Sequence, residues 1–240
     1  MNGHDDDCPA TFASPPFFMH ELDPDYQMDP GVLHSRQHPE VKLWRKAERE
    51  RLIDIRLSLT AGLRRDYDGQ IAQNLADEIG DFKGMIISAY WPFKGEPNLR
   101  PFLKAVVEQG GRCALPVVVG RDEPLEFRAC SPGDMLEPGV WNIPVPRKTA
   151  EIVVPDVVIA PVIGFDPNCH RLGYGGGFFD RTLATLTNSP RVFGVGYMLS
   201  SIPTIYPQWH DIPMSAVINE KGVSAIVSHD AEDECKRSHK

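Results

Sequence analysis

A cluster of glycines flanked by charged and aromatic side chains is the part of the sequence with the clearest chemistry. Residues 171–181 read Arg-Leu-Gly-Tyr-Gly-Gly-Gly-Phe-Phe-Asp-Arg. Glycine lacks a Cβ atom, so successive backbone N–H groups of such a loop can turn toward one anion. A helix that begins after the glycines adds the positive end of its dipole, and Arg171 can donate charge-assisted hydrogen bonds to phosphate oxygens. The run therefore predicts a phosphate-binding loop.

Two better-known phosphate motifs do not fit this loop. No Gly-Lys-Ser/Thr ends it, which excludes a Walker loop, and its spacing and position exclude a dinucleotide fingerprint. Spacing alone leaves an equal alternative, in which the glycines only form a tight turn between a strand and a helix. The rest of the sequence has to decide between these two interpretations.

Alternating helix and strand patterns surround the loop. Residues 40–63 are charged and helix-favouring, and Ile71, Leu75 and Ile79 recur every four residues, as in a helix with one apolar stripe. Short apolar or β-branched runs predict strands. The predicted strands are residues 85–91, 113–119, 125–128, 157–160, 192–197 and 223–227, and two more predicted helices are residues 99–108 and 181–186, the latter continuing from the glycines.

The order of these elements predicts the fold class. Strands separated by helix-length segments favour a mostly parallel sheet. We therefore predict an α/β fold with helices on both faces of the sheet, a three-layer sandwich in a single domain. Ligands of such sheets lie beyond the carboxyl ends of the strands. Three loops leave predicted strands in this way, namely residues 92–97, 164–177 and 198–211.

Size and composition limit the class of protein. The chain has 240 residues, 42% of them hydrophobic and 24% charged, which suits one large globular domain without disulfides. The formal net charge of −8 argues against a broad nucleic-acid-binding face, and no apolar run approaches the roughly 20 residues of a membrane-spanning helix. The five cysteines are scattered and form no Cys-x-x-Cys pair, which disfavours structural zinc. They also favour a reducing compartment, so we expect a cytoplasmic protein.

The two ends of the chain differ in composition from its middle. Residues 1–38 are rich in Pro, Asp and His without periodicity, and they predict a flexible N-terminal arm. Phe17, Phe18 and Met19 leave open that this arm docks on the body. Residues 229–240 are charged and predict a frayed C-terminal tail. Residues 39–228 form the predicted α/β domain.

Several separated motifs in one order give the loop a more specific meaning. The segment 155–181 resembles the signature of 5-formyltetrahydrofolate cyclo-ligases, with an aspartate at a strand start, then Gly-Phe-Asp, then Arg-Leu-Gly-x-Gly-x-Gly-aromatic-aromatic-Asp. Residues 141–146 resemble the family's Trp-x-Ile-x-x-Pro segment. Glu96 falls where the family has a substrate-contacting glutamate, and His210-Asp211 resembles its late His-Asp pair. Order and spacing match over about residues 40–227, so the domain resembles a cyclo-ligase-like ATP-binding domain.

The resemblance implies an activity. Enzymes of this family close 5-formyltetrahydrofolate to 5,10-methenyltetrahydrofolate while ATP becomes ADP and phosphate. The γ-phosphoryl group moves to the formyl oxygen, N10 attacks the formyl carbon, and phosphate leaves. This chemistry needs no protein nucleophile, so no residue is implied as catalytic in that sense. Arg171 and Asp180 would act by positioning and by neutralising charge.

The resemblance also assigns the site residues. Asp180 and Asp211 match the carboxylates that hold Mg²⁺, the implied cofactor, although each alone is equally a helix-start or turn aspartate. The implied ATP contacts are Lys42, Arg45, Arg171, Leu172, Gly173, Tyr174, Gly175, Gly176, Gly177, Phe178 and Phe179. The implied folate contacts are Trp91, Glu96, Trp141, Tyr174, Gly175, Gly176, Gly177 and Phe178.

Three positions depart from the family pattern. Val41 stands where the family has a lysine, with Lys42 one place away. Phe179 replaces a tyrosine, and Ser200 aligns with a glutamine. These changes leave open an ATP-dependent paralogue that acts on another amide-like or heterocyclic substrate, or a non-catalytic nucleotide-binding regulator. The expected partners are ATP and a reduced folate, with no nucleic acid and no membrane, in a monomer or small homo-oligomer.

Overall fold

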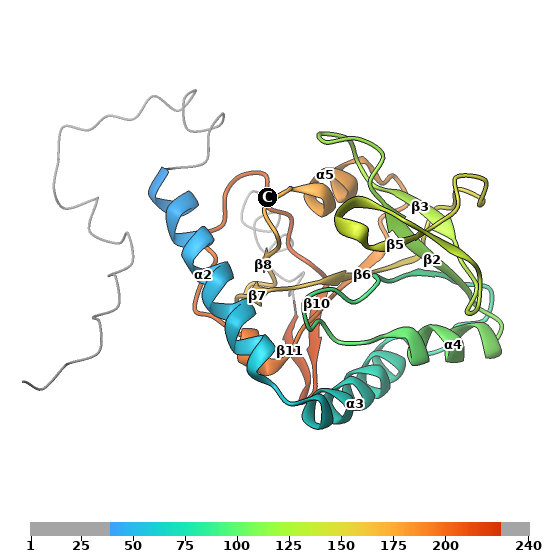
Figure 1. The fold of residues 1–240 in the computed structure, drawn as a ribbon, viewed down its shortest axis with the longest axis horizontal. Helices are drawn as coiled ribbons and strands as arrows, with labels where there is room; N and C mark the ends of the chain where they lie inside the picture. Colours follow the sequence, from blue (N-terminus) through green and yellow to red (C-terminus); the bar gives the residue numbers. More distant parts are fainter. Residues whose placement is uncertain (1–38, 227–240) are drawn as a thin grey trace, which may run out of the picture. The chain divides into compact units, whose positions relative to one another are not determined.

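The structure is a computed structural model, and it describes residues 39–226 of the chain (Figure 1). It divides into two units, Met1–Ala47 and Glu48–Lys240. Helix α2 (Pro39–Ser58) runs across this division, so the described part of the first unit is the beginning of that helix. The predicted N-terminal arm and C-terminal tail lie outside the described residues, and both stay predictions.

A seven-stranded sheet forms the centre of the second unit. Its strand order is β11-β10-β9-β6-β1-β2-β3, and the five inner strands run parallel. The edge strands β3 and β11 pair antiparallel with their neighbours. The prediction of a mostly parallel sheet is therefore confirmed. The strands are β1 (Ile86–Ser88), β2 (Arg112–Val117), β3 (Glu126–Ala129), β6 (Val157–Pro161), β9 (Arg191–Val195), β10 (Ala216–Asn219) and β11 (Gly222–Ile226).

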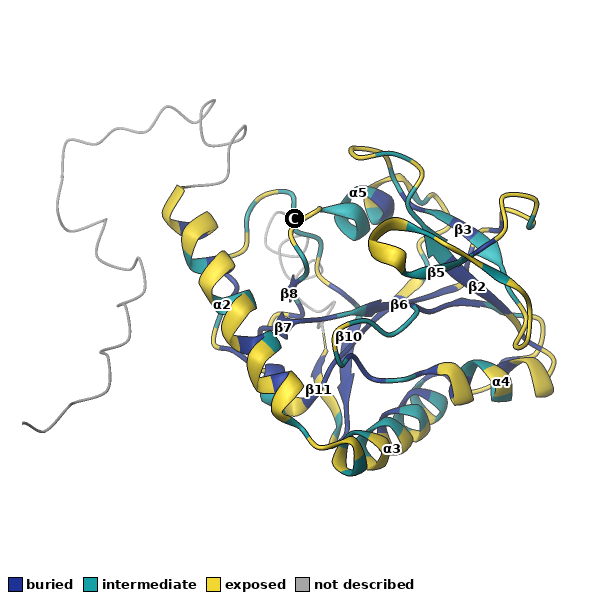
Figure 2. Ribbon diagram, in the orientation of Figure 1, coloured by how far each residue is buried: buried dark blue, intermediate teal, exposed yellow. Residues whose placement is uncertain are grey.

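Two hydrophobic clusters cover the two faces of this sheet. Successive side chains of a strand point to opposite faces, and in β6 Val157 and Ile159 join one cluster while Val158 joins the other. The first cluster packs against helices α3 (Ala61–Ile79) and α4 (Arg100–Glu108). The second packs against helix α5 (Phe178–Thr185). Figures 1 and 2 show α5 on the opposite side of the sheet from α3 and α4, which confirms the three-layer α/β prediction.

The first predicted helix, residues 40–63, is wrong in its extent because the chain breaks at Thr60. That residue is extended, and its hydroxyl accepts a hydrogen bond from the Leu63 backbone N–H at 3.2 Å, so it caps the start of α3. Helix α2 therefore ends at Ser58. The predicted stripe of α3 is confirmed, since Ile71, Leu75 and Ile79 are all buried.

The remaining differences concern short strands. Strand β1 has three residues where seven were predicted, because the chain leaves the sheet after Ser88 to form the loop that contains Glu96. Four-residue β10 was missed, although it is buried along its whole length. Two small hairpins were missed as well. They are β4 (Leu136–Pro138) with β5 (Pro144–Pro146), and β7 (Gly164–Phe165) with β8 (Arg171–Leu172).

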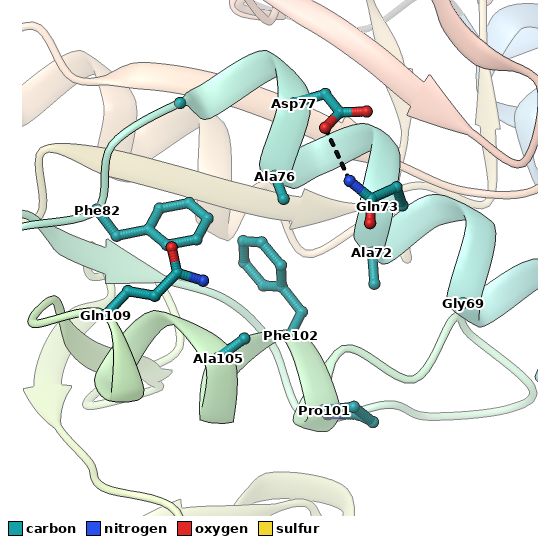
Figure 3. Close-up of a pocket in the computed structure, with 11 residues that line it drawn as sticks. Gly69, Ala72, Gln73, Ala76, Asp77, Phe82, Pro101, Phe102, Ala105 and Gln109 are labelled. Carbon is teal, nitrogen blue, oxygen red and sulfur yellow. Dashed lines mark hydrogen bonds between the residues drawn. The ribbon is translucent and has the colours of Figure 1, made fainter.

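A groove of about 440 Å³ lies between α3 and α4 (Figure 3). The rings of Phe82 and Phe102 line it together with small residues of both helices, and Gln73 donates a hydrogen bond to Asp77 across one turn of α3 at 2.8 Å. Because α3 and α4 cover the sheet face opposite α5, this groove lies apart from the glycine loop that leads into α5.

The inner strands should carry most of the stability of the fold. Phe193 on β9 is 1% exposed and belongs to the cluster under α3 and α4. Phe193→Ala should therefore lower the free energy of unfolding by about 3–5 kcal/mol in denaturant titration. Val223→Ala, on edge strand β11 where the side chain is 41% exposed, should cost under about 1 kcal/mol. Equal losses in both variants would contradict this assignment of the core.

Candidate active site

The glycine loop leaves strand β8 and ends at helix α5. Gly175 and Gly177 have φ values of +94° and +64°, which non-glycine residues rarely adopt. At Gly177 a Cβ atom would also lie 2.9 Å from Nη1 of Arg181. Helix α5 begins at the next residue, so its unpaired N–H groups adjoin the glycines. The loop has the backbone that an anion site at a helix N-terminus requires.

Arg171 is buried at the beginning of this loop and is tied to its end. Its Nη2 atom lies 2.8 Å from Oδ2 of Asp180, and its guanidinium group lies 5.3 Å above the ring of Phe179. Burial lowers the pKa of Arg171, while the charges of Asp180 and Asp211 oppose that shift. Its Nη1 atom has no hydrogen-bond partner within residues 39–226. A buried, charged donor with spare hydrogen-bonding capacity suits a phosphate.

Two further arginines contact the loop, and sequence reasoning missed both. Nε of Arg49 donates to the Gly173 carbonyl at 2.6 Å, and Nη2 of Arg181 donates to the Gly176 carbonyl at 2.7 Å. Nε of Arg181 is buried and lacks a partner in the described part of the chain. The sequence does contain a signal for Arg49. The family's Lys-x-x-x-Arg pattern was placed at Val41 and Arg45, and two basic residues with the same spacing, Arg45 and Arg49, follow one helical turn later.

The predicted basic contacts Lys42 and Arg45 lie on the part of α2 that belongs to the first unit. Their approach to a nucleotide therefore stays a prediction. Arg49 lies on the same helix but in the second unit, and its bond to Gly173 connects α2 to the glycine loop.

The structure brings the two predicted metal ligands together. Oδ1 of Asp180 accepts a hydrogen bond from the backbone N–H of Ile212, the residue after Asp211, at 3.2 Å. Oδ2 of Asp211 accepts from the Gln208 backbone N–H at 2.6 Å, so Asp211 also holds its own turn. No group of three or more His, Cys, Asp or Glu side chains within residues 39–226 has the arrangement of a metal centre. Two carboxylates whose charges both act on Arg171 fit Mg²⁺ that arrives with phosphate, because the phosphate and water oxygens complete its shell.

The Asp of the Gly-Phe-Asp motif has a structural role. Asp166 is 1% exposed, and its Oδ1 atom accepts hydrogen bonds from the backbone N–H groups of Asn168 and His170. Its Oδ2 atom accepts from the N–H of Ile205 at 3.3 Å. Asp166 thus shapes the β7–β8 turn that leads to Arg171 and joins it to the segment before Asp211.

A second group of polar side chains lies around Glu96. This carboxylate is 6% exposed, and it accepts hydrogen bonds from the Phe93 backbone N–H and from the Tyr174 hydroxyl, each at 2.9 Å. Burial raises the pKa of Glu96 to about 7, although Arg56 and both hydrogen bonds oppose that rise. Tyr174 belongs to the glycine loop, so its hydroxyl connects the predicted nucleotide residues to the predicted folate residue.

Arg56 completes this second group, and nothing in the sequence marked it. It lies on α2 and is 1% exposed. Its Nη2 atom donates to the Tyr174 hydroxyl at 2.9 Å, and its Nε atom donates to the Lys94 carbonyl at 3.0 Å. In a helix rich in charged residues, an arginine is normally expected to face water.

Three aromatic rings lie close together beside Glu96. The centroids of Phe93 and Trp141 are 6.1 Å apart with nearly parallel planes, and Tyr174 lies 5.8 Å from the first and 5.9 Å from the second. Trp141 is 58% exposed at a φ of +55°, so its ring is not part of the hydrophobic core. Sequence reasoning missed Phe93. Trp91 packs instead against Arg100 of α4, whose guanidinium group lies 5.2 Å above its ring, and its folate contact stays a prediction.

The positions that depart from the family pattern are accounted for in part. Phe179 supplies the ring beneath Arg171. Ser200 is buried, and its hydroxyl lacks a partner within the described residues. The thiols of Cys113, Cys130 and Cys169 are free, and burial raises the pKa of each, so none of the three is an activated nucleophile.

Comparison with known proteins agrees with this geometry. The sequence profile of the 5-formyltetrahydrofolate cyclo-ligase family matches residues 41–220. The 5-formyltetrahydrofolate cyclo-ligase of Haemophilus influenzae is 25% identical over 183 residues, which cover 72% of this chain and 96% of that protein. The protein of the same name from Mycolicibacterium smegmatis is 32% identical over 154 residues, covering 60% of this chain and 78% of the relative.

A solved structure has the same fold. The NMR structure of Aquifex aeolicus 5,10-methenyltetrahydrofolate synthetase superposes with a TM-score of 0.65 at 26% identity, and it covers 76% of this chain and 92% of that one. Across the described residues, no helix combines the length and apolar character that crossing a membrane requires.

The buried carboxylate of Glu96 predicts a pH-dependent stability. Its pKa is about 7 in the folded chain against 4.5 for an ordinary glutamate, so between these values the folded state holds a proton that the unfolded state has released. Stability should therefore fall as the pH rises through this window, by about 3 kcal/mol in total. Glu96→Gln removes this titration, so the difference between the two unfolding free energies should follow the same window. A difference that stays constant across this window would contradict the assignment.

Proposed function

The chain belongs to the 5-formyltetrahydrofolate cyclo-ligase family, and we propose that it closes 5-formyltetrahydrofolate to 5,10-methenyltetrahydrofolate while ATP becomes ADP and phosphate. One observation supports this proposal in addition to membership of the family. The Tyr174 side chain belongs to the arginine-lined glycine loop, and its hydroxyl reaches Glu96 beside an aromatic cluster. A phosphate site and a site for a flat heterocycle thus share one residue, as phosphoryl transfer from ATP to a folate requires.

In this proposal the glycine loop holds the phosphates of ATP. Arg171 binds them from the beginning of the loop, and the N-terminus of α5 faces them from its end. Arg49 and Arg181, whose guanidinium groups already contact loop carbonyls, add positive charge on either side. The remaining loop contacts are those predicted from the sequence, namely Leu172, Gly173, Tyr174, Gly175, Gly176, Gly177, Phe178 and Phe179, with Lys42 and Arg45 from α2.

Mg²⁺ fits the carboxylates of Asp180 and Asp211, whose charges both act on Arg171. The cation would neutralise part of the phosphate charge. Asp180 also carries the ion pair with Arg171, so the same carboxylate orients the buried guanidinium group and faces the metal position. These two aspartates and Arg171 form the charged centre of the site.

The folate would lie against the aromatic cluster. Trp141 and Phe93 present ring faces on which a pterin can stack, and Glu96 provides carboxylate oxygens for its N–H groups. The formyl oxygen attacks the γ-phosphorus and displaces ADP, N10 then attacks the formyl carbon and loses its proton to solvent, and the carbon–oxygen bond breaks as phosphate departs, which leaves the methenyl cation. The chain contributes orientation and charge, because none of its groups bonds covalently to the substrate.

The setting of this activity follows from its substrates. ATP and reduced folates are intracellular metabolites, and the described cysteines are free thiols, so we place the protein in the cytoplasm. We assign the activity to residues 39–228, the α/β domain predicted from the sequence.

A direct assay tests the proposed function. Purified full-length protein with 5-formyltetrahydrofolate and ATP-Mg²⁺ should form the methenyl product, measured by its absorbance, with one phosphate released per turnover. ATP hydrolysis or ATP binding without methenyl formation would refute the folate assignment and favour another amide-like substrate on the same nucleotide site.

Ligand-induced stabilisation tests the site residues without a folate. ATP-Mg²⁺ at about 100 times its dissociation constant should add about 2.7 kcal/mol to the unfolding free energy. Arg171→Ala should reduce this gain. Asp211→Asn should reduce it only when magnesium is present, since it loses a hard anionic oxygen. Asp180→Asn should reduce it most when magnesium is present, since it loses such an oxygen and also the ion pair that orients Arg171. The gain is read against each variant without ligand, because Arg171→Ala also breaks an ion pair. Arg112→Ala, a half-exposed arginine that pairs with Glu151, is the control and should keep the full gain. Equal gains in all variants would refute the site.

A further inference from the structure

Among the charged side chains of residues 39–226 that have no role so far, Arg56 is the most buried. It is 1% exposed, it lies on α2 outside the glycine motif, and it is neither a predicted phosphate contact nor a predicted folate contact. A buried cation is costly unless its donors find acceptors and its charge finds an opposite one. The acceptors that Arg56 uses therefore indicate its role.

The guanidinium group of Arg56 bonds to three separate loops. Nε donates to the carbonyl of Lys94 in the loop after β1 at 3.0 Å, and Nη1 donates to the carbonyl of Val162 after β6 at 3.4 Å. Nη2 donates to the hydroxyl of Tyr174 in the glycine loop at 2.9 Å. The loops of Lys94 and Val162 leave the carboxyl ends of the parallel strands β1 and β6, whereas the glycine loop leaves β8, whose antiparallel hairpin with β7 follows β6. The planar guanidinium fork can reach acceptors in three directions, which a lysine ammonium on a flexible stem does less precisely.

These bonds also fix the direction of the hydrogen bond between Tyr174 and Glu96. An arginine can only donate, so the Tyr174 oxygen accepts from Arg56 and its single proton remains to be donated. An ionised carboxylate can only accept, and Oε1 of Glu96 takes that hydrogen bond at 2.9 Å. The order Arg56 to Tyr174 to Glu96 therefore favours the ionised form of the carboxylate.

We propose that Arg56 is a positioning residue that acts through Tyr174. It joins the loop that carries Glu96 to the glycine loop, favours the ionised form of the Glu96 carboxylate and orients that carboxylate where it meets the pterin. This inference rests on the proposed function for its substrate, but the link from Arg56 to Glu96 is a property of the protein alone.

The surroundings of Glu96 make its charge sensitive to Arg56. Burial raises the pKa of Glu96, and the Arg56 charge is the largest influence that lowers it. Within residues 39–226, Arg56 is the only cation among the groups that influence Glu96. Further ionisable groups lie behind this pair. The first is Tyr90, whose pKa is raised by burial and then by the charge of Glu96. The others are Tyr197, Asp68 and Arg64, and Arg64 lies near the backbone of Gly95. Loss of Arg56 should therefore raise the pKa of Glu96 further.

The kinetic test compares four single variants and one double variant with the unmodified enzyme. Arg56→Met removes charge and fork, Arg56→Lys keeps the charge alone, and Tyr174→Phe keeps the ring and removes the connecting hydroxyl. Arg51→Met is the matched control, because Arg51 lies on the same helix, is about half exposed and pairs only locally with Glu48. The KM for 5-formyltetrahydrofolate, the Kd of ATP-Mg²⁺ and the pH profile of kcat/KM are measured for each.

Arg56→Met should raise the folate KM by about tenfold or more and move the acid limb of kcat/KM upward by about one pH unit, since an opposite charge at this range shifts a carboxyl pKa by that much or more. The Kd of ATP-Mg²⁺ should stay within about twofold, and Arg51→Met should match the unmodified enzyme. Arg56→Lys should restore the pH profile more than the KM. In the double variant Arg56→Met/Tyr174→Phe, the effects on folate KM should be less than additive, because both substitutions break the same hydrogen-bonded path from Arg56 to Glu96.

A substrate-free measurement separates this inference from the proposed function. The unfolding free energy is measured against pH for the unmodified protein, Arg56→Met and Arg56→Lys, each with and without the additional substitution Glu96→Gln. For each protein, the unfolding free energy with Glu96 is compared with that of its Glu96→Gln form. The difference between the two values shows the pH window over which ionisation of Glu96 lowers stability. This window should extend to higher pH in Arg56→Met, which lacks the charge, and stay in place in Arg56→Lys, which keeps it.

The outcomes that overturn the role of Arg56 are distinct from those that overturn the function. An unchanged window in Arg56→Met, or a folate KM and pH profile that match those of Arg51→Met, would overturn the role of Arg56. If Arg56→Met does not fold, Arg56→Lys decides, because it loses the guanidinium fork: its folate KM must exceed that of Arg51→Met, and equal KM values would overturn the role of Arg56. Absence of turnover in the unmodified protein would refute the proposed function and leave the stability test of Arg56 standing.

Discussion

The ion pair between Arg171 and Asp180 is the constraint on which the proposed nucleotide site depends. It connects the residue that begins the glycine loop to the first turn of the helix that ends it, across 2.8 Å. The backbone between them is rich in glycine and has little stiffness of its own. Breaking such a buried pair by removing one partner generally costs about 3–5 kcal/mol, because the other charge is left uncompensated. The backbone of the loop can therefore be flexible while the ion pair holds both of its ends.

The sheet decides which loops can meet at this pair. Glu96 follows β1, the glycine loop follows β6 through the β7–β8 hairpin, and Asp211 follows β9. These three strands are parallel neighbours in the order β9-β6-β1, so their carboxyl ends share one edge. Residues far apart in the sequence are thereby brought together, because the strands that precede them pair side by side. Asp166 reinforces this convergence, since one buried carboxylate bonds both the β7–β8 turn and the segment that leads to Asp211.

The sequence predicted the parts of the fold that depend on periodicity. The stripe Ile71, Leu75 and Ile79 and the β-branched run of β6 were predicted because burial on one or both faces imposes a pattern. Hairpins with two or three residues per strand carry no such pattern, and neither does the break at Thr60, which depends on a single cap. The motif residues of the site were predicted by resemblance. Arg56 and Phe93 were not, because a charged helix residue and a lone aromatic show their role only through partners distant in sequence.

Charge is balanced separately in the two halves of the site. Arg171 is paired with Asp180 in the nucleotide half, and Arg56 is linked through Tyr174 to Glu96 in the folate half. Each buried cation therefore has its own carboxylate before any ligand is bound, which limits the desolvation cost of folding. The two pairs also differ in a useful way. Asp180 contacts its arginine directly, whereas Glu96 is separated from its arginine by a hydroxyl group and has a pKa raised to about 7. A small change near Glu96 alters its charge at neutral pH, while an arginine paired with a carboxylate stays charged there, so the folate half is where this fold can tune its response to pH.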